Sequence, residues 1–372
     1  MIAVLGFPDG ALGVVWPSLR HTFGRPVGDL GILALAGLVP YLVTSTGIAR
    51  LVHRIGFGAM AVVFSALATA AMTMWASAPV WAAVVAAVAV FGLARGAVDS
   101  GFNAYISEHE GVRRLGLLHA GYGIGATVAP LVVASVLSLG AGWRVAIAVL
   151  AAANGVVAIL CVAARHGWRA TMVHHHADSE GATPRTGRTP GVVMILVTFI
   201  VYTAAEAGTG AWAFVVSTDG RHLDRGLCAA AVATYWAMLT GGRFLLAGIG
   251  GRVRSETLLI VGSALAVGGL AFFWIDRSAE GLGGLALAGF GFAATFPVAI
   301  SLVPGYVGPR RSAQVIGWCV AFAAIGGPAG TAAAGLVAGS AGLNGVPVMF
   351  VGLAAALLVS VARLSSIRPA PN

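Results

Sequence analysis

Residues 79–105 are PVWAAVVAAVAVFGLARGAVDSGFNAY, an apolar run long enough to cross a bilayer that nevertheless contains a cation and an anion. A spanning helix needs about 20 mainly apolar residues, and a charge near its centre costs about 2.5–3.5 kcal/mol on insertion scales. Arg95, Asp99 and Asn103 follow one another at intervals of four, so a helix places them on one face. That face cannot contact lipid. The stretch therefore predicts a spanning helix whose polar face is covered by other helices.

The whole chain has the composition of a membrane bundle. It is 58% hydrophobic and only 9% charged, with a mean hydropathy of +0.91, whereas soluble domains are about 45–50% apolar. The 53 glycines suit helices that pack closely in lipid. We predict an all-α integral membrane protein with twelve transmembrane helices, over residues 1–19, 29–49, 57–76, 79–105, 115–139, 143–164, 191–217, 226–249, 257–275, 281–304, 312–339 and 345–363.

The arginines in the predicted loops indicate the orientation. Fourteen lie on the side of the N-terminus and six on the other, so the positive-inside rule predicts that both termini lie in the cytoplasm. We expect the protein to be located in the inner (plasma) membrane of the cell. The sequence pI near 10.5 comes from these scattered arginines, and their distribution argues against a nucleic-acid partner. The first apolar run contains Asp9 and lacks a basic segment before it, so we expect no cleavable signal peptide.

The two halves of the chain resemble each other at an offset of 197 or 198 residues. The motif of residues 65–68, SALA, recurs at 263–266, and Arg113-Arg114 recurs as Arg310-Arg311. The matches keep their order along the chain, and they include Pro130 with Pro328 and Asp9 with Glu206. A parallel repeat of six helices is an architecture that secondary transporters use. We predict a six-helix bundle over 1–164, a cytoplasmic linker over 165–190 and a second bundle over 191–372.

The face formed by Arg95, Asp99 and Asn103 has two interpretations. It can be an internal salt bridge that holds its helix to the neighbours, with Arg95 and Asp99 as the pair. Alternatively, Asp99 binds a transported proton, and Arg95 switches its proton affinity by moving towards or away from the carboxylate. In the second interpretation Asn103 belongs to the wall of a substrate cavity.

Asp9 and Glu206 are expected to face each other across a central cavity, because they occupy equivalent positions in the first helix of each half. Prolines and glycines around Asp9 weaken the helix there, and broken helices near the bilayer midplane often mark binding sites. The alternative for Asp9 is a cap on a helix that starts at that residue.

Four more side chains are candidates for the cavity wall. Aromatic and amide groups suit a hydroxylated ligand, and on this ground Trp212 and Tyr122 are assigned to substrate binding. His119, one turn before Tyr122, is added, although a lone histidine in an apolar helix is more often hydrogen-bonded to a neighbour. Arg243 either binds substrate or pairs with Glu206.

No pattern in the chain suggests a metal, a cofactor or an enzyme's nucleophile–base pair. The tract His174-His175-His176 has no spaced acidic or cysteine partners, so we expect a solvated part of the linker. The three cysteines lie in apolar stretches and are expected to be small buried side chains, at positions Cys161, Cys228 and Cys319.

These motifs together resemble the fucose permease-like branch of the major facilitator superfamily, over the whole chain. The similarity lies in GFPDG at 6–10, RGxxDxxxN at 95–103, YGxG at 122–125, ExGxGxW at 206–212 and GGPAG at 326–330. In the sugar–proton symporter of that branch, acids of the first and fourth helices serve substrate binding and proton uptake. The resemblance implies these roles for Asp9 and Asp99.

The resemblance has limits that leave the substrate open. An Asp-Arg pair is usual in the superfamily where this chain has His53-Arg54, and the sugar permease has amides in place of His119 and Tyr122. The sugar permease also has a neutral polar group in place of Glu206. The expected function is therefore proton-coupled symport of a small polar solute such as a sugar, by alternating access and as a monomer. The alternatives are a proton-driven exporter of an amphipathic or cationic compound and a non-transporting sensor, for which a long tail or extra domain would be expected.

Overall fold

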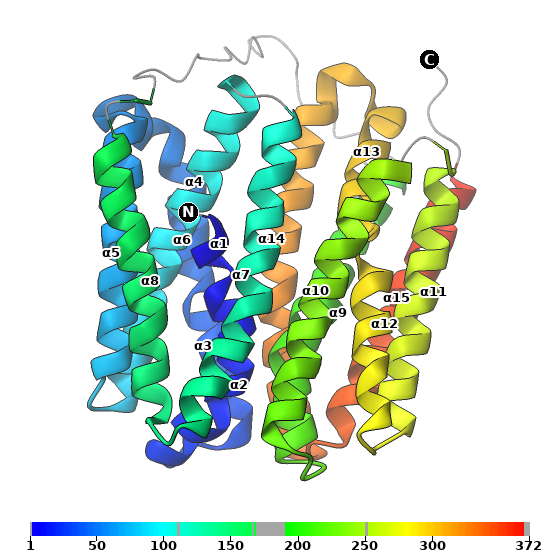
Figure 1. Ribbon diagram of the computed structural model, residues 1–372. Helices are drawn as coiled ribbons and strands as arrows, with labels where there is room; N and C mark the ends of the chain where they lie inside the picture. The colour runs from blue at the N-terminus through cyan, green and yellow to red at the C-terminus, as the bar shows by residue number, and fades with distance from the viewer. Residues whose placement is uncertain (1, 110–111, 166, 169–189, 250–251, 368–372) are drawn as a thin grey trace.

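The computed structural model describes residues 2–109, 112–165, 167–168, 190–249 and 252–367. The described chain is almost entirely helical, and its long helices run side by side as a bundle (Figure 1). The first half contains α1 (Ile2–Leu5), α2 (Phe7–Thr22), η1 (Val27–Asp29), α3 (Leu30–Ala36), α4 (Leu38–Ile55), α5 (Phe57–Ser77), α6 (Trp81–His109), α7 (Val112–Ser138) and α8 (Gly142–Ala164).

The second half has the same number of membrane-length helices as the first, if consecutive short helices such as α12 and α13 are counted as one. It contains α9 (Pro190–Thr218), α10 (Arg225–Ile249), α11 (Ser255–Ile275), η2 (Glu280–Leu282), α12 (Gly283–Phe292), α13 (Thr295–Val307), α14 (Pro309–Ser340) and α15 (Gly345–Ser366). Ten described spans are long and apolar enough to cross a membrane, and the more polar rods α1–α2 and α10 complete the predicted twelve. Most of the predicted linker, including His174, His175 and His176, lies outside the described residues.

The surface of the bundle is apolar where lipid would surround it. Among the most exposed side chains are Val39, Ile159, Leu160 and Leu336, at 60–77% of their full accessibility. In water such exposure would be costly, whereas lipid tails are as apolar as these side chains. The three predicted buried cysteines are indeed buried.

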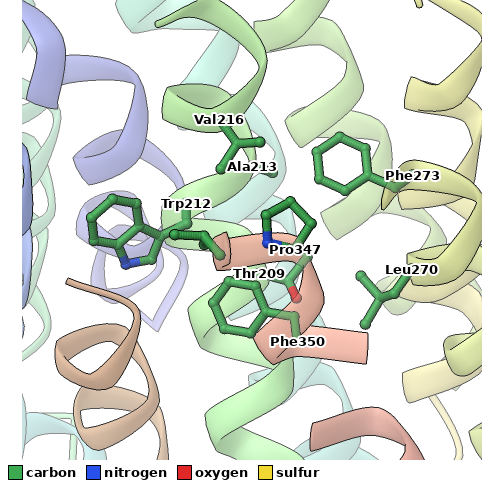
Figure 2. A pocket seen from close by; sticks show the side chains of 9 residues that line it. Thr209, Trp212, Ala213, Val216, Leu270, Phe273, Pro347 and Phe350 are labelled. Carbon is green, nitrogen blue, oxygen red and sulfur yellow. The ribbon is translucent and has the colours of Figure 1, made fainter. Parts of the chain in front are cut away.

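The interior is packed by aromatic side chains around α9, the most deeply buried of the candidate spans. Trp212 is fully buried, and its indole N–H donates to the carbonyl of Thr331 on α14 at 3.0 Å. Beside it, Phe273 of α11 and Phe350 of α15 close a small apolar cavity with room for about one water molecule (Figure 2). This region therefore belongs to the packing between helices.

The two halves meet through backbone contacts that only glycine permits. A Cβ atom on Gly13 of α2 would lie 2.3 Å from the carbonyl oxygen of Ala211 on α9, and one on Gly31 of α3 would lie 2.7 Å from the Cα of Ala332 on α14. An ion pair joins the same side of the bundle, since Arg20 near the end of α2 contacts Asp219 just after α9 at 2.8 Å. These contacts hold the halves together at the end of the bundle where α2 and α9 finish, opposite the start of α9 (Figure 1).

Candidate functional site: three carboxylates inside the bundle

Asp9 is the centre of a cluster built by three helices of the first half. Arg95 of α6 contacts both of its carboxylate oxygens, with Nη2–Oδ2 at 2.8 Å and Nη1–Oδ1 at 3.1 Å. The hydroxyl of Tyr122 on α7 donates to Oδ2 at 2.5 Å. A bidentate guanidinium and a phenol together provide a strong, directional set of donors for a carboxylate. The alternative that Asp9 caps its helix is wrong, because α2 begins at Phe7 without a side-chain cap.

Asp99 has a separate set of partners, and all of them in the described part of the chain are neutral. The hydroxyl of Tyr41 on α4 donates to Oδ2 at 2.8 Å, and the amide of Asn103 donates to Oδ1 at 2.9 Å. The same amide also donates to the backbone carbonyl of Asp99 at 2.8 Å. Asp99 therefore has no arginine in direct contact among the described residues.

The predicted pairing of Arg95 with Asp99 is thus not the arrangement in the structure, where Arg95 binds Asp9. Helical side chains lean towards the N-terminus of their helix, so an arginine points away from an acid that follows it by four residues. The reverse order, with the acid first, is the favourable one for such a pair. Asp9, on a neighbouring helix, is the acid that the Arg95 side chain contacts.

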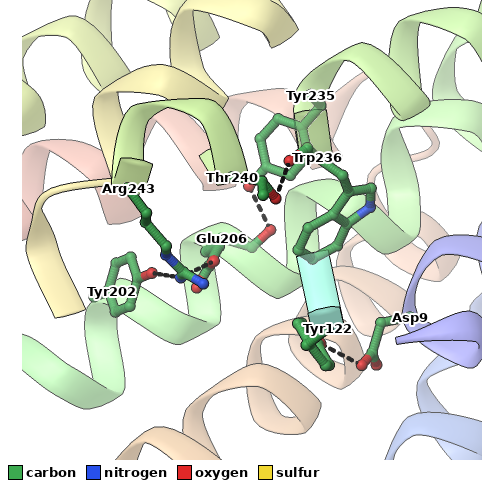
Figure 3. Close-up of polar contacts among 8 residues, drawn as sticks. All are labelled: Asp9, Tyr122, Tyr202, Glu206, Tyr235, Trp236, Thr240 and Arg243. Carbon is green, nitrogen blue, oxygen red and sulfur yellow. Dashed lines mark hydrogen bonds and ion pairs between the residues drawn. The ribbon is translucent and has the colours of Figure 1, made fainter. Parts of the chain in front are cut away.

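Glu206 forms the third cluster, in the second half (Figure 3). Its Oε1 accepts from Nη2 of Arg243 on α10 at 3.2 Å, and the same nitrogen donates to the hydroxyl of Tyr202 at 3.1 Å. The backbone carbonyl of Glu206 accepts from the hydroxyl of Tyr235 at 2.7 Å. Of the two interpretations of Arg243, the structure contains the pairing with Glu206.

The clusters lie in a part of the interior that water can enter. The side chains of Asp9 and Arg95 are 27% and 30% exposed, and that of Arg243 is 27% exposed, although all three lie within spanning helices. Charged groups at this depth in a bundle usually mark an ion or substrate path.

The remaining predicted site residues have different positions. Trp212 is buried in the packing around α9 and has no exposed surface. The side chain of His119 lies outside the described residues. Asn103 and Tyr122 are within the clusters, but the first acts on Asp99 and the second on Asp9.

Sequence reasoning missed the tyrosines that complete the clusters, Tyr41 and Tyr202, and the buried Trp236 of α10. Tyrosines are ordinary in membrane helices, so their presence alone is a weak signal. Tyr202 precedes Glu206 by four residues, which places both on one face of α9 and was the available clue. No comparable clue exists for Tyr41, which lies 58 residues from Asp99.

Comparisons with known proteins agree with this architecture. The model of the Major Facilitator Superfamily matches residues 1–282. A mutant of the nucleoside transporter NupG has a similar structure, with a TM-score of 0.77 at 12% identity and 98% coverage of both chains. No curated protein sequence matches the chain.

Two further solved structures share the fold. An inward-facing, unoccupied bacterial homolog of the human lysosomal transporter Spinster has a TM-score of 0.76 at 15% identity, with 100% of this chain and 97% of the other covered. The transporter FucP in its outward conformation has a TM-score of 0.66 at 13% identity, covering 98% and 97%. At these identities the similarity concerns the fold.

Proposed function

The chain belongs to the major facilitator superfamily, and we propose that it is a proton-coupled symporter that moves a small polar solute across a plasma membrane by alternating access. It is a membrane transporter and not an enzyme. The observation that carries the proposal is the group of three hydrogen-bonded carboxylates within the spans, Asp9, Asp99 and Glu206, in a water-accessible interior.

Asp99 is the proposed proton carrier. Asp9 and Glu206 each have an arginine in contact, which compensates their negative charge, whereas the described partners of Asp99 are the neutral Tyr41 and Asn103. Among the three carboxylates in the described part of the chain, Asp99 is the one without an opposite charge in direct contact, so its protonation removes a charge that no ion pair compensates. Arg95 contacts both carboxylate oxygens of Asp9, so we assign Asp9 to the solute site and Arg95 to its orientation.

Alternating access is supported by contacts that join the halves near the ends of α2 and α9. Arg20 and Asp219 join them at one end, and the close approach of Gly31 to Ala332 is at the same side of the bundle. The interior acids remain partly exposed to water. We propose that this conformation is closed on the outer side and that the solute enters or leaves through the cytoplasmic side.

A polar solute fits the clusters better than the amphipathic cation of the export alternative. A cation would need an unpaired acid, but Asp9 and Glu206 are already paired with arginines, and the third carboxylate, Asp99, is assigned to the proton. The fold is also that of a nucleoside transporter, which carries a polar solute. We propose that the protein acts as a monomer, because both halves of the site lie within one chain.

The proposal is tested with the purified protein in proteoliposomes that contain a pH-sensitive dye. Neutral monosaccharides, sugar acids and sugar amines are added one at a time to the outside. A transported solute is expected to acidify the lumen as it enters, with a rate that saturates with solute concentration. Uptake of radiolabelled solute without any proton movement would contradict proton coupling.

A further inference from the structure

The α10 helix presents two buried hydrogen-bond donors that have no acceptor among the described residues. They are Nε of Arg243 and the indole nitrogen of Trp236, which both lie in the protein interior. The two residues are seven apart, so they share one face of α10, about 10 Å apart along its axis. In Figure 3 the indole lies above the Tyr122–Asp9 pair and to the right of Glu206.

The ion pair at Arg243 is less complete than the one at Arg95. Arg95 uses two nitrogens to contact both oxygens of Asp9, at 2.8 and 3.1 Å. Arg243 uses Nη2 alone for both of its contacts, at 3.2 and 3.1 Å. A guanidinium has five N–H donors in a planar fork, so Arg243 retains donors for another acceptor.

Buried N–H groups that lack an acceptor indicate a ligand that supplies oxygen acceptors. Leaving a buried N–H without an acceptor is costly, and native proteins rarely do so without a functional reason. The guanidinium fork matches the geometry of a carboxylate. Arg243 is also 27% exposed, so a solute in the hydrated interior can reach it.

The charges of the interior favour an anionic solute that travels with a proton. Asp9 is balanced by Arg95 and Glu206 by Arg243, and Asp99 takes the proton in the proposed mechanism. Adding one proton and one anion leaves the net charge of the interior unchanged. A cationic solute would find both remaining carboxylates already paired.

We propose that the transported solute is a small hydroxylated carboxylate, and that its carboxylate binds Arg243 in competition with Glu206. This inference rests on the proposed function, because it assigns the substrate class of the same site. The solute's carboxylate takes the Nη2 donor that now contacts Glu206 together with donors that Glu206 leaves free, so the two acids compete for one guanidinium. Proton and anion enter together, so transport is electroneutral.

The test measures binding by the purified, detergent-solubilised protein through its thermal unfolding. The probes are matched triplets of one polyol skeleton, of three to six carbons, in neutral, carboxylate and amine form. Wild type is expected to be stabilised by a carboxylate member and not by its neutral or amine counterparts. Stabilisation by neutral or amine members, or by no carboxylate member, would overturn the proposal.

Two variants separate ligand binding from a purely structural role. Glu206→Gln frees Arg243 from its competitor, so the carboxylate is expected to bind about tenfold more tightly. The double variant Glu206→Gln with Arg243→Gln keeps the charge balance and is expected to lose carboxylate binding while it still folds. If Glu206→Gln weakened carboxylate binding, or the double variant retained it, Arg243 would not be the anion site.

The outcomes also distinguish this inference from the proposed function. Carboxylate binding at Arg243 without proton movement in proteoliposomes would refute the coupling but leave the substrate class standing. Proton-coupled uptake of neutral members alone would refute the substrate class and leave the coupling standing.

Discussion

Each interior carboxylate has its own set of donors, and these sets were only partly predictable. The acids themselves are evident in the sequence, because a charge within an apolar run is costly. The contact between Glu206 and Arg243 was one of two interpretations and is present. The partner of Arg95 was not predictable from helical spacing, because spacing gives neighbours on one helix and not the residue that a packed second helix presents.

The Asp9–Arg95 pair is expected to stabilise the fold. Asp9→Asn leaves Arg95 without its anion inside the bundle, and since the pair is about 30% exposed we expect a loss of about 1–3 kcal/mol, less than for a fully buried pair. Thermal unfolding in detergent measures the loss. A second change, Arg95→Gln in the same background, is expected to restore part of it.

The control for this prediction is an ion pair on the surface. Arg254 and Glu256 are 3.7 Å apart, with Arg254 84% exposed, so Arg254→Gln is expected to change stability by no more than about 0.5 kcal/mol. An Asp9→Asn protein as stable as this control would show that the interior pair contributes nothing to folding.

The helices were largely predictable, because each spanning segment is an apolar run of bilayer length bounded by loop residues. The positions at which a spanning segment is interrupted were harder to predict from the sequence. The second predicted span is divided at Gly37 into α3 and α4, and the tenth divides between Phe292 and Thr295 into α12 and α13. The glycines that let helices approach were visible as composition, but which of the 53 lie at a contact depends on the packing.

The contact between α3 and α14 gives a prediction at this scale. Gly31→Ala places a Cβ 2.7 Å from the Cα of Ala332, so the helices must separate, and we expect a loss of about 1–3 kcal/mol. The same substitution at Gly268 of α11 meets no atom within 4 Å and should be neutral or stabilising by up to about 1 kcal/mol. Melting temperatures of the two variants test the difference; equal values would refute the close contact.

The whole molecule is a pair of helix bundles that pack against each other through the helix pairs α2–α9, α3–α14 and α7–α10. The internal repeat at 197–198 residues anticipated two similar six-helix halves, and the family match is consistent with that architecture. The side on which the halves close was not predictable, because one sequence must satisfy every conformation of a transport cycle. The Arg20–Asp219 pair joins residues almost 200 positions apart, and nothing local in the sequence marks it.

Proton coupling through Asp99 is the central claim about the whole molecule, and Asp99→Asn tests it most directly. The amide keeps the size of the side chain but cannot take up a proton. Its oxygen can accept from Asn103 as the carboxylate does, and its nitrogen can donate to the Tyr41 hydroxyl, which then acts as the acceptor. In proteoliposomes loaded with the carboxylate solute, we expect the variant to lose accumulation driven by a pH gradient. Exchange of solute between the two sides at equal pH should continue at the wild-type rate.

Two results would contradict the account. Undiminished accumulation by Asp99→Asn under the pH gradient would mean that another group carries the proton. Loss of both accumulation and exchange, in a protein with the wild-type melting temperature, would assign Asp99 to solute binding or to the conformational change instead of to the proton.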